Sequence, residues 1–177
     1  MKHGLNTDLI EKIPPRTYEV QAGHILGLQV LQDWVDWADE SIVAGYDSPS
    51  LRILAGLQPP FDDHEVNRLA KKAFAELKIV SLTKDNCSPF CIEPILRKAT
   101  QGKLTKKEAL EKLKDLCLAT GYGKPFMNFY LLYFALSDLE TSERQWYWKD
   151  ANRENINQII DDYFQNWLKN YDETLSV

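Results

Sequence analysis

Apolar residues recur at intervals of three and four along most of the chain, which is the spacing of one face of an α-helix. In the clearest stretch, Val66, Leu69, Ala73 and Phe74 share one face while charged residues cover the other. Proline and glycine residues divide the pattern, which predicts helices over residues 18–43, 49–57, 62–77, 89–100, 105–120, 125–139 and 152–168. Only residues 78–82 (KIVSL) read as a strand, and they are too few to build a sheet alone.

Short polar motifs mark where several of these helices begin. Ser48 is a typical N-cap before Pro49, and Thr105 and Glu108 have the spacing of a capping box. Pro14 and Pro15 exclude a helix near the start of the chain. The sequence therefore predicts an all-α, single-domain bundle of six or seven helices over residues 17–177, preceded by a flexible lead-in of residues 1–16.

Composition narrows the class of protein. The 177 residues fit one domain, and 44% of them are hydrophobic, which suffices for a packed core. A net charge of −5 argues against binding nucleic acid through its phosphates, so no nucleic acid is expected as a partner. Residues 1–16 lack the apolar run of a secretion signal, and no apolar run reaches the ~18 residues of a membrane span. Three cysteines, Cys87, Cys91 and Cys117, suggest free thiols in a reducing compartment, so we expect a cytoplasmic protein without membrane contact.

Motifs for known chemistry are missing from the sequence. It contains no G-x-S-x-G, Walker or G-x-G-x-x-G motif, and neither H-E-x-x-H nor the E-x-x-H pairs of di-iron bundles. The densest cluster of ligand-type side chains, Asp62-Asp63-His64-Glu65, suits a hard cation but equally suits the start of a helix, where acids meet free N–H groups. We favour capping, and expect no enzyme, cofactor or metal.

An acidic stripe is expected on the first long helix. At 100° per residue, Asp33, Asp36 and Glu40 fall on one narrow arc that Trp37 borders, whereas Trp34 points toward the core. An acidic face edged by an aromatic side chain suits a basic protein partner, because the acids steer association and tryptophan supplies apolar contact area. The alternatives are a solvated helix face with Trp37 half-buried and, less plausibly, paired carboxylates for glycoside hydrolysis.

A cationic and aromatic patch lies between the last two predicted helices, at Arg144, Gln145, Trp146, Tyr147, Trp148 and Lys149. Aromatic rings with basic neighbours stack on single-stranded nucleic acid in some proteins. A loop anchored on the bundle by its aromatic side chains is the favoured interpretation. Trp146 and Trp148 are also candidate contacts with a protein partner or with a second copy of the chain.

Part of the chain, residues 46–121, resembles a set of small, uncharacterised all-helical bacterial proteins, some of which resemble immunity proteins of contact-dependent or polymorphic toxin systems. The residues that resemble them are Asp47-Ser48-Pro49-Ser50-Leu51-Arg52-Ile53-Leu54-Ala55-Gly56-Leu57, Ala75-Glu76-Leu77, Ile95-Leu96, Gly102-Lys103-Leu104-Thr105 and Glu108-Ala109. These are turns and helix caps, so the resemblance transfers no functional residue. It implies a non-enzymatic binding protein.

The sequence thus favours a cytoplasmic, non-enzymatic protein-binding domain. Its more specific form is an immunity-like inhibitor whose acidic face, with Asp33, Asp36, Trp37 and Glu40, covers a basic toxin. The alternatives are a small-ligand-binding or enzymatic helical bundle of unknown substrate, and a structural homo-oligomer that uses Trp146 and Trp148. The oligomeric state is left open.

Overall fold

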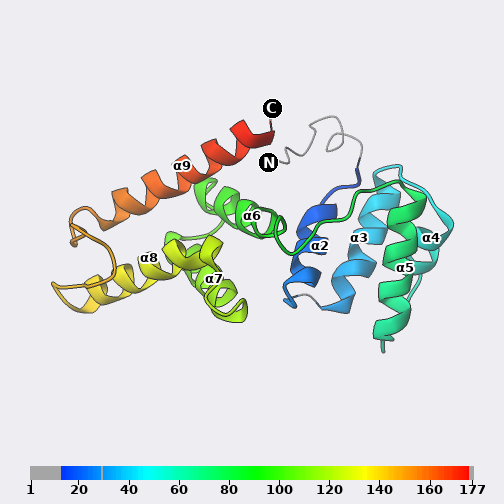
Figure 1. The fold of residues 1–177 in the computed structure, drawn as a ribbon, viewed down its shortest axis with the longest axis horizontal. Coiled ribbons are helices and arrows are strands. Elements are labelled where there is room, and N and C mark those ends of the chain that lie inside the picture. The colour runs from blue at the N-terminus through cyan, green and yellow to red at the C-terminus, as the bar shows by residue number, and fades with distance from the viewer. Residues whose placement is uncertain (1–12, 29, 176–177) are drawn as a thin grey trace. The chain divides into compact units, whose positions relative to one another are not determined.

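The computed structural model describes residues 13–28 and 30–175, which contain eight helices and no strand (Figure 1). This confirms the all-α prediction, with eight helices in place of the six or seven expected. The described residues divide into two compact units, 13–87 and 88–175, and each is described by itself. The prediction of one domain over residues 17–177 stays a prediction. None of the helices in the described part combines the length and the apolar character that crossing a membrane requires.

The N-terminal unit contains α2 (Thr17–Ile25), α3 (Leu31–Val43), α4 (Pro49–Ala55) and α5 (Asp63–Glu76). The single helix predicted over residues 18–43 is wrong, because the chain turns between α2 and α3. Gly27 has a φ of 70° there, in the left-handed region that favours glycine. The N–H of Leu28 donates to the carbonyl of Gly23 at 2.9 Å, which closes the end of α2.

Residues 1–12 of the predicted lead-in lie outside the described residues, whereas residues 13–16 are bound to the N-terminal unit. Pro14 is buried, and its carbonyl accepts a hydrogen bond from the Thr17 hydroxyl at 2.7 Å. The carbonyl of Ile13 accepts one from the Tyr46 hydroxyl at 2.9 Å. These bonds tie the start of α2 to the chain that follows α3.

Aromatic side chains fill the core where α3 meets α5. The ring of Trp37 lies 5.6 Å from that of Trp34 and 5.3 Å from that of Phe74, measured between centroids. Val66 and Leu69 of α5 are also buried, as are Leu51 and Leu54 of α4, the helix that packs against α5. The apolar face predicted for α5 is thus a core face.

Helix caps lie where the sequence motifs predicted them. Ser48 accepts from the N–H of Leu51 at 3.2 Å, and Asp62 accepts from the N–H of Glu65 at 2.8 Å. Thr105 and Glu108 form the reciprocal capping box. The favoured interpretation of the acidic run that starts at Asp62 as a helix cap is therefore confirmed.

Residues 78–82, the weak strand signal, form no strand. Ile79 and Leu82 are buried in an extended segment, and the N–H of Leu82 donates to Oε1 of Gln21 in α2 at 2.8 Å. The backbone N–H of Leu82 is therefore satisfied by a side-chain oxygen, and not by the backbone carbonyl of a neighbouring strand.

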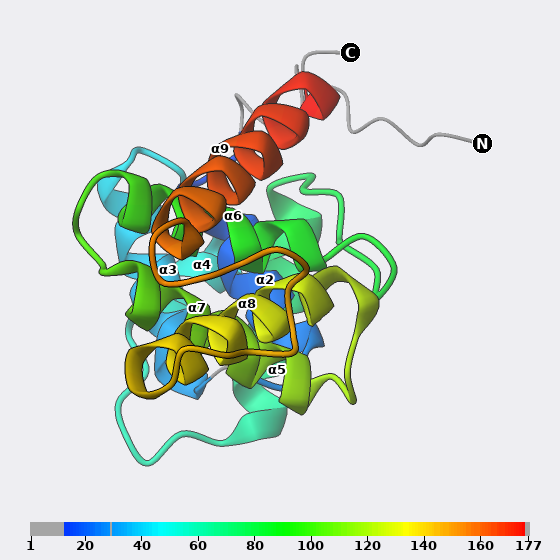
Figure 2. The ribbon, with the colours of Figure 1, turned by 90° about the vertical axis from the view of Figure 1, so that its left-hand side faces the viewer.

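The C-terminal unit contains α6 (Ser88–Thr100), α7 (Lys106–Ala119), α8 (Lys124–Thr141) and α9 (Ile156–Leu175). α7 packs against α8, and α9 packs chiefly against α6. Figure 2 shows residues 142–155 as the orange connection between α8 and α9. Pro94 lies in the second turn of α6, not in the first as expected. The last helix begins four residues later than predicted, because the Asn152 side chain accepts from the N–H groups of Glu154 and Asn155 and forms a turn.

Replacing the glycine between α2 and α3 tests the turn. Gly27→Ala meets no atom within 4 Å, so its cost comes only from the left-handed backbone, and we expect the free energy of unfolding to fall by about 1 kcal/mol. Urea unfolding followed by circular dichroism measures the change. Gly56→Ala is the control: its φ is −81° and its nearest contacts are an ordinary 3.6 Å, so stability should be unchanged or raised by up to about 1 kcal/mol. An equal loss of stability in both variants would contradict the conclusion that the left-handed backbone at Gly27 requires glycine.

Candidate functional site

The loop between α8 and α9 holds one aromatic side chain in solvent. Trp146 is 86% exposed, yet the loop around it is fixed by the side chain of Gln145. Oε1 of Gln145 accepts from the N–H groups of Tyr147 and Trp148 at 2.8 Å each, and Nε2 donates to the carbonyls of Trp148 and Ala151. Four hydrogen bonds from one amide thus fix the backbone that follows Trp146, at Tyr147, Trp148 and Ala151.

Trp148, the second tryptophan that the sequence singled out in this loop, is half-buried. Its ring meets the edge of the Tyr163 ring of α9 at 5.6 Å. Arg153 adds a second brace, because its Nε donates to the carbonyl of Leu139 at 2.9 Å and to that of Ser142 at 3.1 Å. The favoured interpretation of this segment, a loop held on the helices by its aromatics, agrees with the position of Trp148, whereas Trp146 faces solvent.

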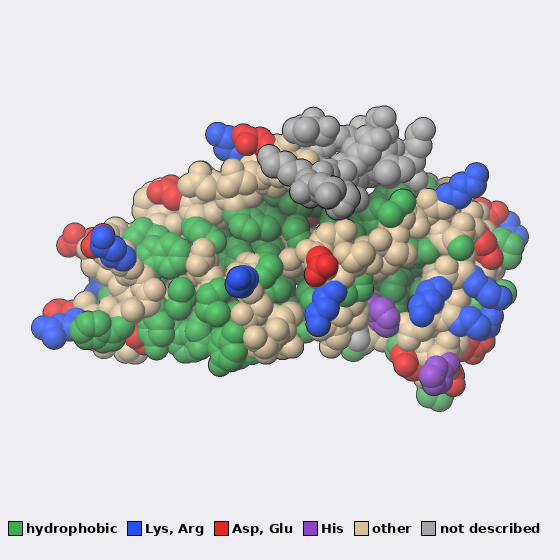
Figure 3. All heavy atoms as spheres, viewed as in Figure 1, with side chains coloured by type: hydrophobic (Ala, Val, Ile, Leu, Met, Phe, Trp, Pro, Cys, Tyr) green, Lys and Arg blue, Asp and Glu red, His purple; other side chains and the backbone are tan. Residues whose placement is uncertain are grey.

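A row of aromatic rings continues from this loop along α8. The Tyr147 ring lies 5.3 Å from that of Phe134, the Phe134 ring 4.8 Å from that of Tyr130, and the Tyr130 ring 5.6 Å from that of Tyr122. Tyr122 is 54% exposed and the others are partly exposed. We call Tyr122, Tyr130, Phe134, Trp146 and Tyr147 the aromatic surface. In the view of Figure 3, apolar side chains cover much of the C-terminal unit.

The hydroxyl group of Tyr130 in this row is uncharged at neutral pH. Partial burial, reinforced by the neighbouring Tyr122, raises the pKa of Tyr130 above its usual value near 10. The aromatic surface is therefore an apolar area with neutral hydrogen-bonding groups, as is typical of protein interfaces.

The predicted acidic stripe of α3 is only partly free. Asp33 accepts from the N–H of Val30 at 3.3 Å at the start of the helix, and Glu40 forms an ion pair with Arg16 at 2.7 Å. Asp36 is exposed and accepts from Gln32 at 2.8 Å. Asp39 is exposed as well. In the described part of the chain, Asp36 and Asp39 form no ion pair, so the negative charge of this face is concentrated there.

Trp37 does not border that face. It is fully buried, and its Nε1 donates to the Thr17 hydroxyl at 2.9 Å. The prediction that Trp37 lies at the surface beside Asp33, Asp36 and Glu40 is therefore wrong. The Thr17 hydroxyl and the Phe74 ring contact the Trp37 indole, and a helical projection of α3 alone contains neither.

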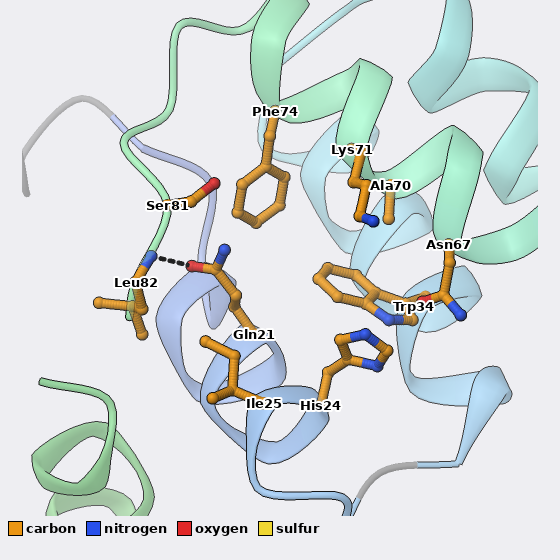
Figure 4. A pocket seen from close by; sticks show the side chains of 10 residues that line it. All are labelled: Gln21, His24, Ile25, Trp34, Asn67, Ala70, Lys71, Phe74, Ser81 and Leu82. Carbon is orange, nitrogen blue, oxygen red and sulfur yellow. Dashed lines mark hydrogen bonds between the residues drawn. The ribbon is translucent and has the colours of Figure 1, made fainter. Parts of the chain in front are cut away.

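A pocket of about 240 Å³ lies within the N-terminal unit, between α2, α5 and the extended segment (Figure 4). Aromatic and aliphatic side chains form its walls, and several polar groups face it. The indole Nε1 of Trp34 is buried without a hydrogen-bond partner. Among residues 13–28 and 30–175, every other buried nitrogen or oxygen atom of a side chain has a partner. The lining residues are Gln21, His24, Ile25, Trp34, Asn67, Ala70, Lys71, Phe74, Ser81 and Leu82.

Sequence reasoning missed this pocket. Its residues come from three helices and from a segment that lies some 60 positions after α2, and no sequence motif joins them. The described residues hold no group of three or more His, Cys, Asp or Glu side chains placed to bind a metal ion. Comparison of the chain with family models, curated proteins and solved structures gives no match.

Removing the amide of Gln145 tests whether it fixes the Trp146 loop. In Gln145→Met the N–H groups of Tyr147 and Trp148 lose their acceptor, so we expect their hydrogen exchange to become about tenfold faster, equivalent to roughly 1.4 kcal/mol. Hydrogen–deuterium exchange read by NMR measures it. Gln165→Met, on the exposed face of α9, should leave both amides unchanged. Unchanged exchange in Gln145→Met would show that the loop is held by other contacts.

Proposed function

We propose that this chain is a non-enzymatic protein-binding domain and that Trp146 is its principal contact. The observation behind the proposal is an 86% exposed tryptophan on a loop whose backbone is fixed by Gln145. Exposing a large apolar ring to water is unfavourable, and the loop's hydrogen bonds keep it there. A rigid loop also loses little conformational entropy on binding, which favours affinity.

The neighbouring residues support the same proposal. Tyrosine and tryptophan are enriched among the residues that contribute most to binding at protein interfaces. Tyr147, Phe134, Tyr130 and Tyr122 extend the apolar area from the loop along α8. The row presents flat rings with few rotatable bonds, so a partner orders few side chains when it binds there.

The more specific form of the proposal is an immunity-like inhibitor of a basic toxin that acts in the cytoplasm. The net charge of −5 and the resemblance of residues 46–121 to bacterial proteins of that kind support it. Asp36 and Asp39 supply unneutralised charge for steering a basic partner. The three described cysteines are free thiols, as is usual in a reducing compartment.

Removing the exposed ring tests the principal contact. The full chain is immobilised, proteins retained from the native host are identified, and the affinity of the retained protein is measured by calorimetry. We expect Trp146→Ser to weaken that affinity about 30-fold, the effect of losing about 2 kcal/mol at an interface hot spot. Val43→Ser is the control, because Val43 is 89% exposed and lies in the other unit, and it should bind as the parent chain does.

Two results would contradict this proposal. One is a partner that binds parent chain and Trp146→Ser equally well. The other is self-association that Trp146→Ser abolishes, detected by light scattering, because Trp146 would then join copies of the chain.

Removing the free acids of α3 tests the steering. For a basic partner, the double variant Asp36→Asn, Asp39→Asn should lower the association rate constant roughly threefold at low salt and reduce its dependence on ionic strength. Stopped-flow kinetics at several salt concentrations measures both. The pair Asp85→Asn, Glu111→Gln changes the net charge equally at exposed positions outside α3 and the Trp146 loop and should have a smaller effect. The same salt dependence in both double variants would show that α3 is not the docking face.

A further inference from the structure

We propose that the pocket of the N-terminal unit binds a small aromatic carboxylate, with the ring between its apolar walls and the carboxylate toward Lys71. This binding site is separate from the protein-binding surface proposed above and does not depend on it. Figure 4 shows the pocket from close by, with side chains from α2, α3, α5 and residues 81–82 around one space.

The walls define the body of the ligand. Trp34 and Phe74 meet edge to face at 5.7 Å, and Ile25 and Leu82 lie on the side of α2 and the extended segment. Apolar walls of this kind favour a flat hydrocarbon ring. The volume of about 240 Å³ suits a single ring with a short substituent, because a cavity of roughly 150 Å³ already holds benzene.

The amide of Gln21 faces the pocket with its donors. Its Oε1 is occupied by the N–H of Leu82 at 2.8 Å, so its NH₂ group is left to the space between Phe74 and Ser81 (Figure 4). Gln21 is only 8% exposed, and an NH₂ group that faces a pocket can donate to an acceptor on a ligand. A bound carboxylate or its ring substituent supplies one.

Lys71 gives the pocket its charge. It lies on α5 at the pocket's exposed edge, and within the described ranges it makes no ion pair. On the same helix, the carboxylate of Asp63 accepts a hydrogen bond from the side-chain amide of the lining residue Asn67 at 2.8 Å, and it forms no ion pair with Lys71. A single cation next to neutral donors suits one carboxylate and is too little positive charge for a polyphosphate.

The buried indole N–H of Trp34 adds a third donor. Its Nε1 has no partner, and the exposed His24 ring packs against the indole at 5.8 Å between centroids. Leaving a buried donor unsatisfied is unfavourable, and a rotation of the exposed His24 side chain opens Nε1 to the pocket. A ligand acceptor then gains a hydrogen bond that the empty pocket lacks.

Three probes that share a phenyl ring and a two-carbon side chain test the ligand class: phenylacetate, 2-phenylethanol and 2-phenylethylamine. Each is titrated into the full-length ¹⁵N-labelled chain, and NMR records the indole N–H signals. We expect phenylacetate to shift the Trp34 signal, identified by its loss in Trp34→Phe, and to bind about fivefold more tightly than the alcohol. The amine should bind most weakly of the three, because its ammonium group meets Lys71.

The variants separate the charge from the fold. Lys71→Gln, at an exposed position, should lose the fivefold preference for phenylacetate over the alcohol, while Lys72→Gln, its neighbour outside the pocket, should keep it. Equal binding of acid and alcohol by the parent chain, or tighter binding of the amine, would overturn the carboxylate assignment. If none of the probes shifts the Trp34 signal at about 10 mM, where single-ring ligands of even weak affinity bind, the pocket holds only water and the proposal is wrong.

Discussion

The burial of apolar side chains where helices cross is the interaction on which both units depend, and aromatic rings are its largest members. In the N-terminal unit Trp34 and Trp37 of α3 meet Phe74 of α5, and in the C-terminal unit Phe129 of α8 meets Tyr163 and Phe164 of α9. Burying one such ring removes some 150–250 Å² from water, worth roughly 4–6 kcal/mol at about 25 cal/mol per Å². Ion pairs such as Lys106–Asp161 at 2.7 Å lie near the surface, where the typical contribution is about 0–1 kcal/mol. Burial of apolar side chains, aliphatic as well as aromatic, therefore contributes more than surface charge to holding the helices together.

Local signals in the sequence were sufficient for most helix boundaries. The caps at Ser48, Asp62 and Thr105 depend on side chains three residues away, and the sequence pattern predicts such contacts directly. The break at Gly27 was missed because its cause is distant: α2 turns back so that Thr17 reaches Trp37, twenty residues later. Helical periodicity is equally compatible with one long helix or two short ones, and this contact adds to the left-handed turn at Gly27 in favouring two.

The candidate sites differ in the same way. An exposed tryptophan in a polar loop is visible in the sequence, and Trp146 was singled out on that basis. The burial of Trp37 could not be predicted in this way, because the residues that contact its ring, Thr17 of α2 and Phe74 of α5, belong to two other helices. The pocket was the least predictable feature, since a hydrogen bond between Gln21 and Leu82, 61 positions apart, brings two of its sides together. Neither residue has a neighbour in sequence that indicates the contact.

Two local departures from ordinary folding rules are the strongest arguments for function. Most large apolar side chains of the described helices are buried and most buried polar groups are paired, so Trp146 in solvent and Trp34 Nε1 without a partner stand out. Each is unfavourable for folding alone, and each persists because nearby contacts hold it, the Gln145 amide in one case and the rings of Trp37 and Phe74 in the other. Strain of this kind is expected where binding supplies the missing contact. The two positions also call for different ligands: an exposed ring on a rigid loop suits a broad macromolecular surface, whereas an enclosed donor among aromatic walls suits a small molecule that bears an acceptor.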